Sequence, residues 1–276
     1  MLLWPLALHG QPAPAARPAG GQELVERALA NELRAAQDTS HPMRYKLRKS
    51  SPRLTTIKEL VETRDGLVAR LISVDGESLS AAAEKKEQQR LDALLRDPGK
   101  QRHRKQGEDQ DAQRALKVLR ALSTAFVYEL AADSDSGAPP GAIVKFAFRP
   151  NPAFDPPDLE TQALTAMEGE IWIDRTQERV TRLQGRLQRD VDFGWGILGR
   201  LNKGGWILIE QAEVSAQEWR AVHFQMQMSG RVLFKTKIFE TEEQESDFVP
   251  VPPGIGYQRG IELLRAGESS SGGSSR

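Results

Sequence analysis

The motif with the most direct chemical meaning is Gly194-Trp195-Gly196-Ile197-Leu198-Gly199, which fits G-x-G-x-x-G. In a dinucleotide site such glycines lie between a strand and a helix, so that the phosphates meet the helix N-terminus. Here only residues 200–203 separate the motif from Gly204-Gly205 and the next expected strand, so no helix fits. The pattern therefore indicates a flexible connection between strands or, alternatively, a mobile loop at a cavity mouth, where Trp195, Ile197 and Leu198 would cover an apolar ligand.

Other residues that could do chemistry form no convincing site. Asp190 and Asp192 are expected on one strand face, where paired carboxylates can divide acid and base roles. Arg182, Arg186 and Gln188 share that face, however, as on a wet outer surface. No histidine stands at metal-ligand spacing from another histidine or a carboxylate; the four histidines are His9, His41, His103 and His223.

Cysteine is absent, which excludes disulfides, thiolate zinc sites and cysteine nucleophiles. Ser123 and Ser215 lack the glycine-flanked turn that activates a serine nucleophile. We therefore predict a protein that is not an enzyme, with no catalytic residue, no bound metal and no cofactor.

The charge balance limits the classes of partner. Thirty-eight basic and 38 acidic residues give a formal net charge of zero, so the whole chain has no long-range attraction to nucleic acid or anionic lipid. One basic cluster stands out, opposed only by Asp97: Arg96, Lys100, Arg102, Arg104 and Lys105. It indicates either a solvated loop or a peripheral contact with anionic lipid head groups. Nucleic acid is not expected, because no stacking aromatic residues accompany the cluster.

The first residues resemble part of a secretory signal. A short apolar run at 2–8 is followed by Ala13-Pro14-Ala15-Ala16, a small-residue stretch like a cleavage site. We expect residues 1–21 to be a leader that is a truncated signal or a disordered segment, and the protein to be periplasmic or otherwise exported. We expect a single domain over 22–255 and a tail at 256–276 that is disordered at its end, because the last residues are rich in Gly and Ser.

Alternation of apolar and polar residues predicts strands over most of the chain. It is clearest at 180–193, where Leu183, Leu187, Val191 and Phe193 share one face. Short turns between such runs favour an antiparallel meander. The other expected strands are 43–49, 53–63, 66–75, 144–148, 169–174, 205–211, 219–228 and 231–239, with a turn at Ser229-Gly230 before the last.

Helical periodicity predicts three helices. Residues 22–37 carry an apolar stripe, and residues 81–95 are mostly good helix formers that end at Asp97-Pro98-Gly99. Residues 100–111 are almost wholly polar and indicate a loop, after which a second inserted helix follows to about residue 126. The insertion at 81–126 is too amphipathic to stand alone in water, so we expect it to cover one face of the sheet.

Two groups of residues carry a resemblance to a known family. Gly169-Glu-Ile-Trp-Ile-Asp174, a turn, and Arg182-Leu183 resemble a hairpin of the periplasmic lipoprotein-carrier (LolA/LolB-like) superfamily. A second resemblance is to exported bacterial proteins of unassigned role thought to share that fold. It rests on Gly194–Gly199 through Gly204-Gly205-Trp206, followed by Trp219 and Gly230. The resemblance implies a mainly β, α+β fold, namely an unclosed and strongly curved antiparallel β-barrel covered by an inserted helical plug. Such carriers hold acyl chains between barrel and helices.

Aromatic and Met side chains form the main apolar mass of the second half. They indicate either ordinary core packing or the lining of a cavity. As cavity lining we predict Phe146, Phe148, Trp172, Trp195, Leu198, Trp206, Phe224 and Met226. The expected function is then binding of a lipid or lipoprotein acyl chain; the alternative is a cell-envelope protein-interaction scaffold whose cavity is filled by its own side chains.

Overall fold

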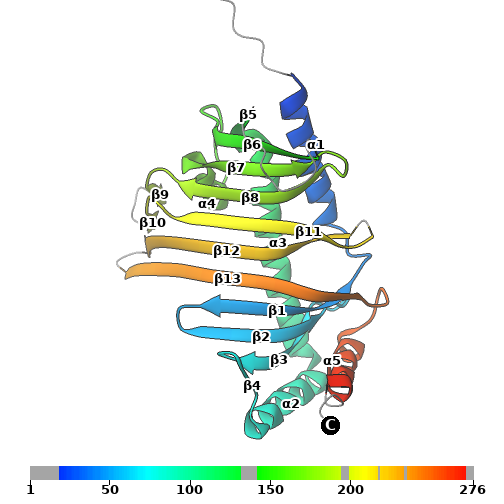
Figure 1. Cartoon of the computed structure of the whole chain (residues 1–276). Helices are drawn as coiled ribbons and strands as arrows, with labels where there is room; N and C mark the ends of the chain where they lie inside the picture. Colours follow the sequence, from blue (N-terminus) through cyan, green and yellow to red (C-terminus); the bar gives the residue numbers. More distant parts are fainter. Residues whose placement is uncertain (1–18, 132–141, 194–198, 217, 233–234, 272–276) are drawn as a thin grey trace, which may run out of the picture.

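The chain folds as an α+β structure around one large antiparallel sheet (Figure 1). The computed structural model describes residues 19–131, 142–193, 199–216, 218–232 and 235–271. From edge to edge, the sheet runs β4 (Glu77–Ser78), β3 (Val68–Val74), β2 (Leu54–Val61), β1 (Met43–Ser51), β13 (Lys235–Pro250), β12 (Glu218–Val232), β11 (Trp206–Ser215), β8 (Arg179–Leu187), β7 (Met167–Asp174), β6 (Ile143–Pro150) and β5 (Phe126–Leu130). Its two edge strands do not pair with each other, so the sheet is open.

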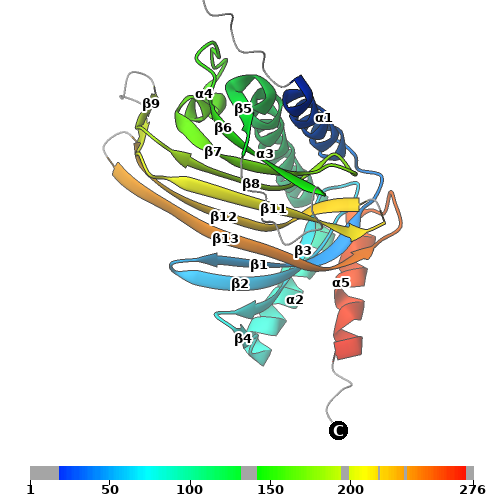
Figure 2. The same ribbon diagram turned by 45° about the horizontal axis from the view of Figure 1, so that its top comes forward.

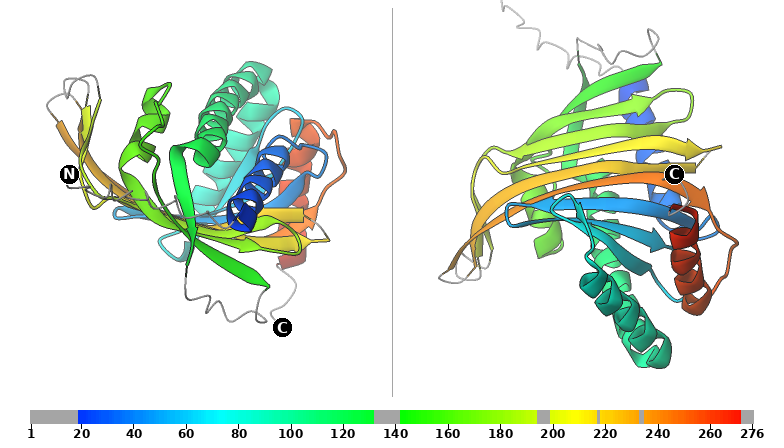
Figure 3. Two further views of the ribbon diagram at one scale, coloured as in Figure 1. Left: turned by 90° about the horizontal axis from the view of Figure 1, so that it is seen from above. Right: turned by 60° about the horizontal axis from the view of Figure 1, so that its bottom comes forward.

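Two long helices lie on the same side of the sheet (Figure 2). They are α1 (Ala19–Ala35) and α3 (Pro98–Ala125), and the sheet bends around the side that carries them (Figure 3). We call this side the inner face and the opposite side the outer face. The remaining helices are α2 (Ala81–Arg96), the short α4 (Leu159–Gln162), the 3₁₀ turn η1 (Ala163–Ala166) and α5 (Tyr257–Ser271).

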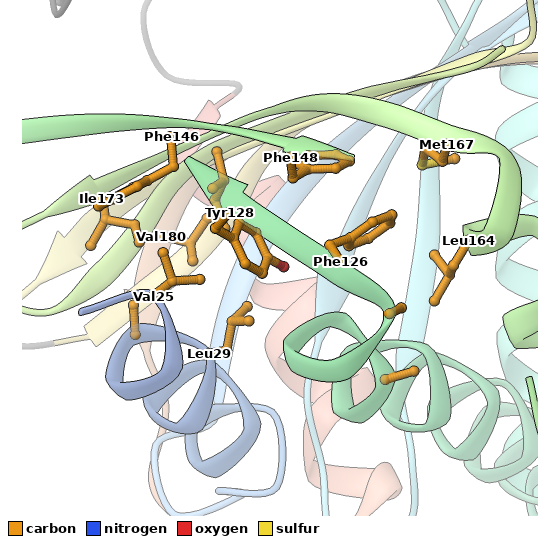
Figure 4. Packing of buried hydrophobic residues seen from close by; sticks show 14 of the residues in the cluster. Val25, Leu29, Phe126, Tyr128, Phe146, Phe148, Leu164, Met167, Ile173 and Val180 are labelled. Atoms are coloured by element: carbon orange, nitrogen blue, oxygen red, sulfur yellow. The ribbon is translucent and has the colours of Figure 1, made fainter. Parts of the chain in front are cut away.

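The strand alternation predicted from the sequence is confirmed in the main core. Val144, Phe146 and Phe148 of β6 are all at most 5% exposed, and Leu187 and Val191 lie in the same cluster. Figure 4 shows Phe146 and Phe148 beside the aromatic pair of β5, Phe126 and Tyr128, with Val25 and Leu29 of α1 below them. The inner face of β5, β6 and β7 is thus filled by the protein itself.

The expected long strand at 180–193 is interrupted. β8 ends at Leu187, and residues 191–193 form a separate strand, β9 (Val191–Phe193), which pairs with β10 (Gly199–Leu201). At this break the Arg200 guanidinium of β10 pairs with both Asp190 and Asp192. These two aspartates therefore hold a hairpin together.

The expected turn at Ser229-Gly230 is also wrong. β12 continues through both residues to Val232, and its far end pairs with β10. Gly230 is required here for close approach rather than for a turn, since a Cβ at this position would lie 2.3 Å from the carbonyl oxygen of Arg200.

The polar segment 100–111 is helical, contrary to the expected loop. Asp97 caps the new helix with its side chain, and Pro98 occupies the first turn, where its missing N–H is tolerated. The polar side chains then bind the turn before β3: Gln101 and Arg104 donate to the carbonyl oxygen of Leu67, and Glu108 accepts from its N–H. The polar residues of 100–111 therefore form a helix face that binds backbone groups of this turn, rather than a loop.

The segment 256–276, expected as a tail, contains α5. Its residues Ile261 and Leu264 are fully buried against Val61 and Val68 of the sheet edge and against Leu91 of α2. The folded part therefore extends past residue 255. Across the described residues, no helix combines the length and apolarity needed to cross a membrane.

Candidate binding pocket

An apolar hollow lies between the inner face and the two long helices. Its volume is about 310 Å³, within the range of small-molecule sites. Six aliphatic side chains from α1, α3, β8 and β11 line it: Leu29, Leu119, Leu122, Val180, Leu183 and Ile209. We call this hollow the inner pocket. It exists because the aromatic core fills the inner face only up to β8, while α1 and α3 continue across β11 and β12.

One wall of the inner pocket is a buried ion pair. Arg179 donates from Nε and Nη2 to the two carboxylate oxygens of Glu32 at 2.8 and 3.0 Å, and both side chains are about nine-tenths buried. The backbone N–H of Val180 and the amide of Gln211 also donate to Glu32. Together these donors satisfy the hydrogen-bonding capacity of the buried carboxylate.

Trp219 joins this wall. Its ring lies against the Arg179 guanidinium, 5.7 Å from the ring centroid, and its buried Nε1 has no hydrogen-bond partner among the described residues. An indole N–H only donates, so it can serve a ligand acceptor. Arg220 next to it pairs with Glu62 and Glu218. The charged groups lining the inner pocket, Glu32, Glu218, Arg179 and Arg220, therefore balance.

A second hollow adjoins the first at this wall. Its volume is about 640 Å³, and it shares Ala35, Arg179, Glu218 and Trp219 with the inner pocket. Its far side is formed by His41, by Met43 and by prolines at the end of β13. The aliphatic hollow thus leads into a larger and more polar one.

The predicted cavity-lining residues do not form one site. Phe146 and Phe148 are buried in the aromatic core, where the Phe148 ring lies 4.5 Å from that of Phe126. Phe224 and Met226 share the inner face with Ile207 and Ile209, their cross-strand partners, and are partly exposed. They lie beside the inner pocket rather than in its lining.

The prediction that Trp172 and Trp206 line the same cavity is wrong. Trp172 alternates with the fully buried Ile171 and Ile173 and therefore points to the outer face, where it contacts the cations of Lys145 and Arg182. Trp206 is also on the outer face and donates from Nε1 to Gln227. The other two predicted residues, Trp195 and Leu198, lie outside the described residues.

The sequence reading missed the residues that do line the inner pocket. Leu183 was placed on the correct face, and Leu119 and Leu122 fall within the inserted helix that was expected to end at about residue 126. What joins them is the crossing of α3 over β8 and β11, which no local pattern encodes. Trp219 entered through the family resemblance and was not among the predicted cavity-lining residues.

The outer face carries a chain of polar pairs centred on His223. Its Nδ1 lies 2.8 Å from a carboxylate oxygen of Glu210, and its Nε2 lies 3.1 Å from one of Glu242. Burial alone would lower the pKa of His223, but the two carboxylates raise it above the ordinary value. Arg182 continues the chain from Glu210 toward β7. Within the described residues no group of acidic and histidine side chains is arranged to hold a metal ion.

The basic cluster lies on the end of α2 and the first turns of α3, not on a loop. Arg104 and Lys105 pair with Glu108 and Asp109, one helical turn further on. Arg96, Lys100 and Arg102 are exposed.

Comparison of the chain with protein-family models, with curated proteins and with solved structures finds no match. The function is therefore inferred from the sequence and geometry of this chain.

Proposed function

We propose that the chain is an exported, non-enzymatic protein that binds a lipid or an acyl chain in the inner pocket. The fold would then be an unclosed half-barrel whose inserted helices, α2 and α3, form a plug, in the manner of the lipoprotein carriers that the sequence resembles. The observation that carries the proposal is the convergence of six aliphatic side chains from two helices and two strands around one hollow. An acyl chain in this hollow gains about 0.8 kcal/mol for each buried CH₂.

The polar wall supports a particular kind of ligand. The charges of the lining balance, and Glu32 already has a full set of donors. An anionic head group would therefore find no uncompensated cation there, whereas the Trp219 indole can donate to a neutral acceptor. We infer an apolar or neutral amphiphilic ligand whose polar end lies toward the adjoining hollow.

The experiment compares two variants of adjacent residues on β11. Ile209→Phe places a ring into the inner pocket, while Leu208→Phe places the same ring on the outer face. After delipidation, native mass spectrometry and uptake of a fluorescent fatty acid and a fluorescent monoacylglycerol are measured. Loss of room for two CH₂ groups corresponds to about 1.6 kcal/mol, or roughly 15-fold weaker binding for Ile209→Phe.

Leu208→Phe should bind like the wild type. Absence of bound lipid in the purified protein, together with no uptake of either probe, would contradict the proposal. Equal weakening by both variants would place the binding site elsewhere.

A second function is favoured by the filled half of the sheet. Phe146, Phe148 and the rest of the aromatic core leave no space on the inner face of β5, β6 and β7. A cell-envelope interaction scaffold needs only such a packed body with a surface for a partner. Capture of one specific protein by the wild type, with an inner pocket that takes up no probe, would favour this alternative.

The exposed basic residues support a peripheral membrane contact as part of the carrier proposal. Arg96, Lys100 and Arg102 project from the junction of α2 and α3, and each cation near an anionic surface is worth about 1 kcal/mol. Reversing these three charges should reduce binding to vesicles that contain anionic lipid. Unchanged vesicle binding would remove the contact from the proposal.

A further inference from the structure

The outer face of the sheet carries two adjoining hollows that are separate from the inner pocket. The first outer hollow, about 380 Å³ in volume, lies over β7, β8 and β11. The second outer hollow, about 240 Å³ in volume, lies over β11, β12, β13 and the tip of the β1–β2 hairpin. Among the described residues, Trp206 alone lines both. Figure 1 shows these strands in front of α3, so the long helices do not cover this side.

The two hollows are joined by one row of side chains that crosses five neighbouring strands. Arg186 of β8 and Gln227 of β12 lie directly opposite Trp206, one on each side. Glu168 of β7 lies opposite Arg186, and Glu240 of β13 lies opposite Gln227. At a strand spacing of about 4.8 Å, the row is about 19 Å long. Its order is symmetrical, with a ring at the centre, a donor on each side and a carboxylate at each end.

The ring at the centre of this row is held in place. Nε1 of Trp206 donates to Oε1 of Gln227 at 2.9 Å, and the side chain is only partly buried. The face of an aromatic ring carries partial negative charge, so it attracts the C–H groups of a molecule that lies flat on it. Trp206 is therefore an oriented platform between the two outer hollows.

The polar groups of the row retain hydrogen-bonding capacity. Within the described residues, neither the Glu168 nor the Glu240 carboxylate is paired with another side chain. Arg186 donates from one nitrogen to the carbonyl oxygen of Gly204, and Gln227 uses only its oxygen. Each outer hollow therefore offers a ligand at least one free donor beside one free carboxylate.

The next row along the strands supplies amides that are already oriented. Gln184 accepts from Arg182 and donates to Glu170. Gln225 donates to Glu242, which leaves the Gln225 oxygen as an acceptor in the second outer hollow. Side chains that are fixed before binding lose less conformational entropy when a ligand arrives.

This combination of groups selects a chemical class of ligand. Neighbouring hydroxyl groups both donate and accept, so a pair of them matches a donor beside a carboxylate. An acyl chain would leave these polar groups dehydrated and unpaired, which is unfavourable. An anionic ligand would meet two carboxylates, Glu168 and Glu240, against the single cation of Arg186 in the row. A sugar ring with equatorial hydroxyl groups satisfies both requirements, since it has hydroxyl pairs at its edge and C–H groups on its faces.

We propose that the outer face binds an uncharged oligosaccharide, with one pyranose ring stacked on Trp206 and the neighbouring sugars in the two outer hollows. Arg186 and Gln227 donate to its hydroxyl groups, and Glu168 and Glu240 accept from them. This inference is independent of what the inner pocket binds, because the row lies on the opposite face of the sheet.

The test is titration calorimetry with the uncharged tetrasaccharides cellotetraose and chitotetraose. Tetragalacturonate, which carries a carboxylate on every sugar, is the charged comparison and should bind more weakly. Loss of stacking in Trp206→Ala should weaken binding of at least one uncharged tetrasaccharide by about tenfold. Trp206→Phe keeps an aromatic face and should lose less.

A second tryptophan provides a matched control. Trp172 is also on the outer face, but it contacts Lys145 and Arg182 and lines neither outer hollow. Trp172→Ala should therefore leave the affinity unchanged. Ile209→Phe, which fills the inner pocket, should also bind the tetrasaccharides like the wild type.

The carboxylates are tested in the same way. Loss of one hydrogen bond in Glu168→Ala or Glu240→Ala should weaken binding by roughly twofold to tenfold. Glu129→Ala, an exposed change on β5, should have no effect. Circular dichroism checks that each variant folds.

Four results would overturn the proposal. The first is a wild type that binds neither uncharged tetrasaccharide, and the second is tetragalacturonate that binds as tightly as they do. The third is an equal loss in Trp206→Ala and Trp172→Ala. The fourth is a loss of saccharide binding in Ile209→Phe, which would place the sugar in the inner pocket.

Discussion

Replacing Glu245 by Gln should stabilise the protein at alkaline pH. Glu245 lies on β13 opposite Leu47, and it is largely removed from water. Burial raises the pKa of this carboxyl to about 7, and the neighbouring Glu243 and Glu62 carboxylates act in the same direction. Arg220 opposes them only in part, because it is already paired with Glu62 and Glu218.

The size of the effect follows from proton linkage. An ordinary Glu in the unfolded chain has a pKa of 4.5, so between about pH 4.5 and 7 the folded state binds more protons than the unfolded state. Stability therefore falls as pH rises through this window. The two values differ by about 2.5 pH units, each worth about 1.4 kcal/mol, so the ionised carboxylate costs up to about 3 kcal/mol above pH 7. Gln resembles the neutral carboxyl and avoids this cost.

The assay is urea unfolding of both proteins at a series of pH values. The free energies of unfolding should be nearly equal at about pH 4 and should differ by up to about 3 kcal/mol in favour of Glu245→Gln at about pH 8. Glu240→Gln, an exposed change on the same strand, should leave the pH profile unchanged. His223 is present in all three proteins, so its titration cancels in the comparison. A difference that does not vary with pH would refute the reasoning.

Three further predictions concern the outer face, the pocket wall and the β10 contact. The carboxylates raise the pKa of His223, so the wild type should be more stable than His223→Gln at low pH. This difference in the free energy of unfolding should be largest below the ordinary histidine pKa of about 6.5, and it should be lost as pH rises through the raised pKa of His223. Urea unfolding at several pH values measures it. Glu32→Ala leaves the buried Arg179 guanidinium without its partner, and should lower the free energy of unfolding by about 3–5 kcal/mol, with no such loss for Glu240→Ala. Gly230→Ala forces a Cβ against the backbone of Arg200, so hydrogen exchange should show reduced protection of residues 199–201, and unchanged protection there would contradict the close approach.

The sequence predicts sidedness within strands better than the ends of elements. The alternation at Val144, Phe146 and Phe148 places all three in the core, because one face of the sheet is covered and a shift of one residue would expose them. The same rule, applied to Ile171-Trp172-Ile173, would have placed Trp172 on the outer face; its large apolar ring favoured the wrong side.

The ends of helices were harder to predict than the faces of strands, because the same residues can end one helix or begin the next. Asp97-Pro98 can end one helix or begin the next, and here it does both. The polar residues after it bind the backbone of a turn that precedes them in sequence by more than 30 residues. The Gly/Ser-rich end of the chain likewise favoured the prediction of a tail, although Ile261 and Leu264 have the spacing of a short amphipathic helix.

Contacts between distant strands could not be predicted at all. Glu210, His223 and Glu242 meet because the registers of β11, β12 and β13 align them. Each is an ordinary polar residue of its own strand, and the register of β11 and β12 shifts directly after Glu210, so no pattern within one strand indicates that the three meet. The inner pocket has the same origin, since its lining depends on where α3 crosses the sheet.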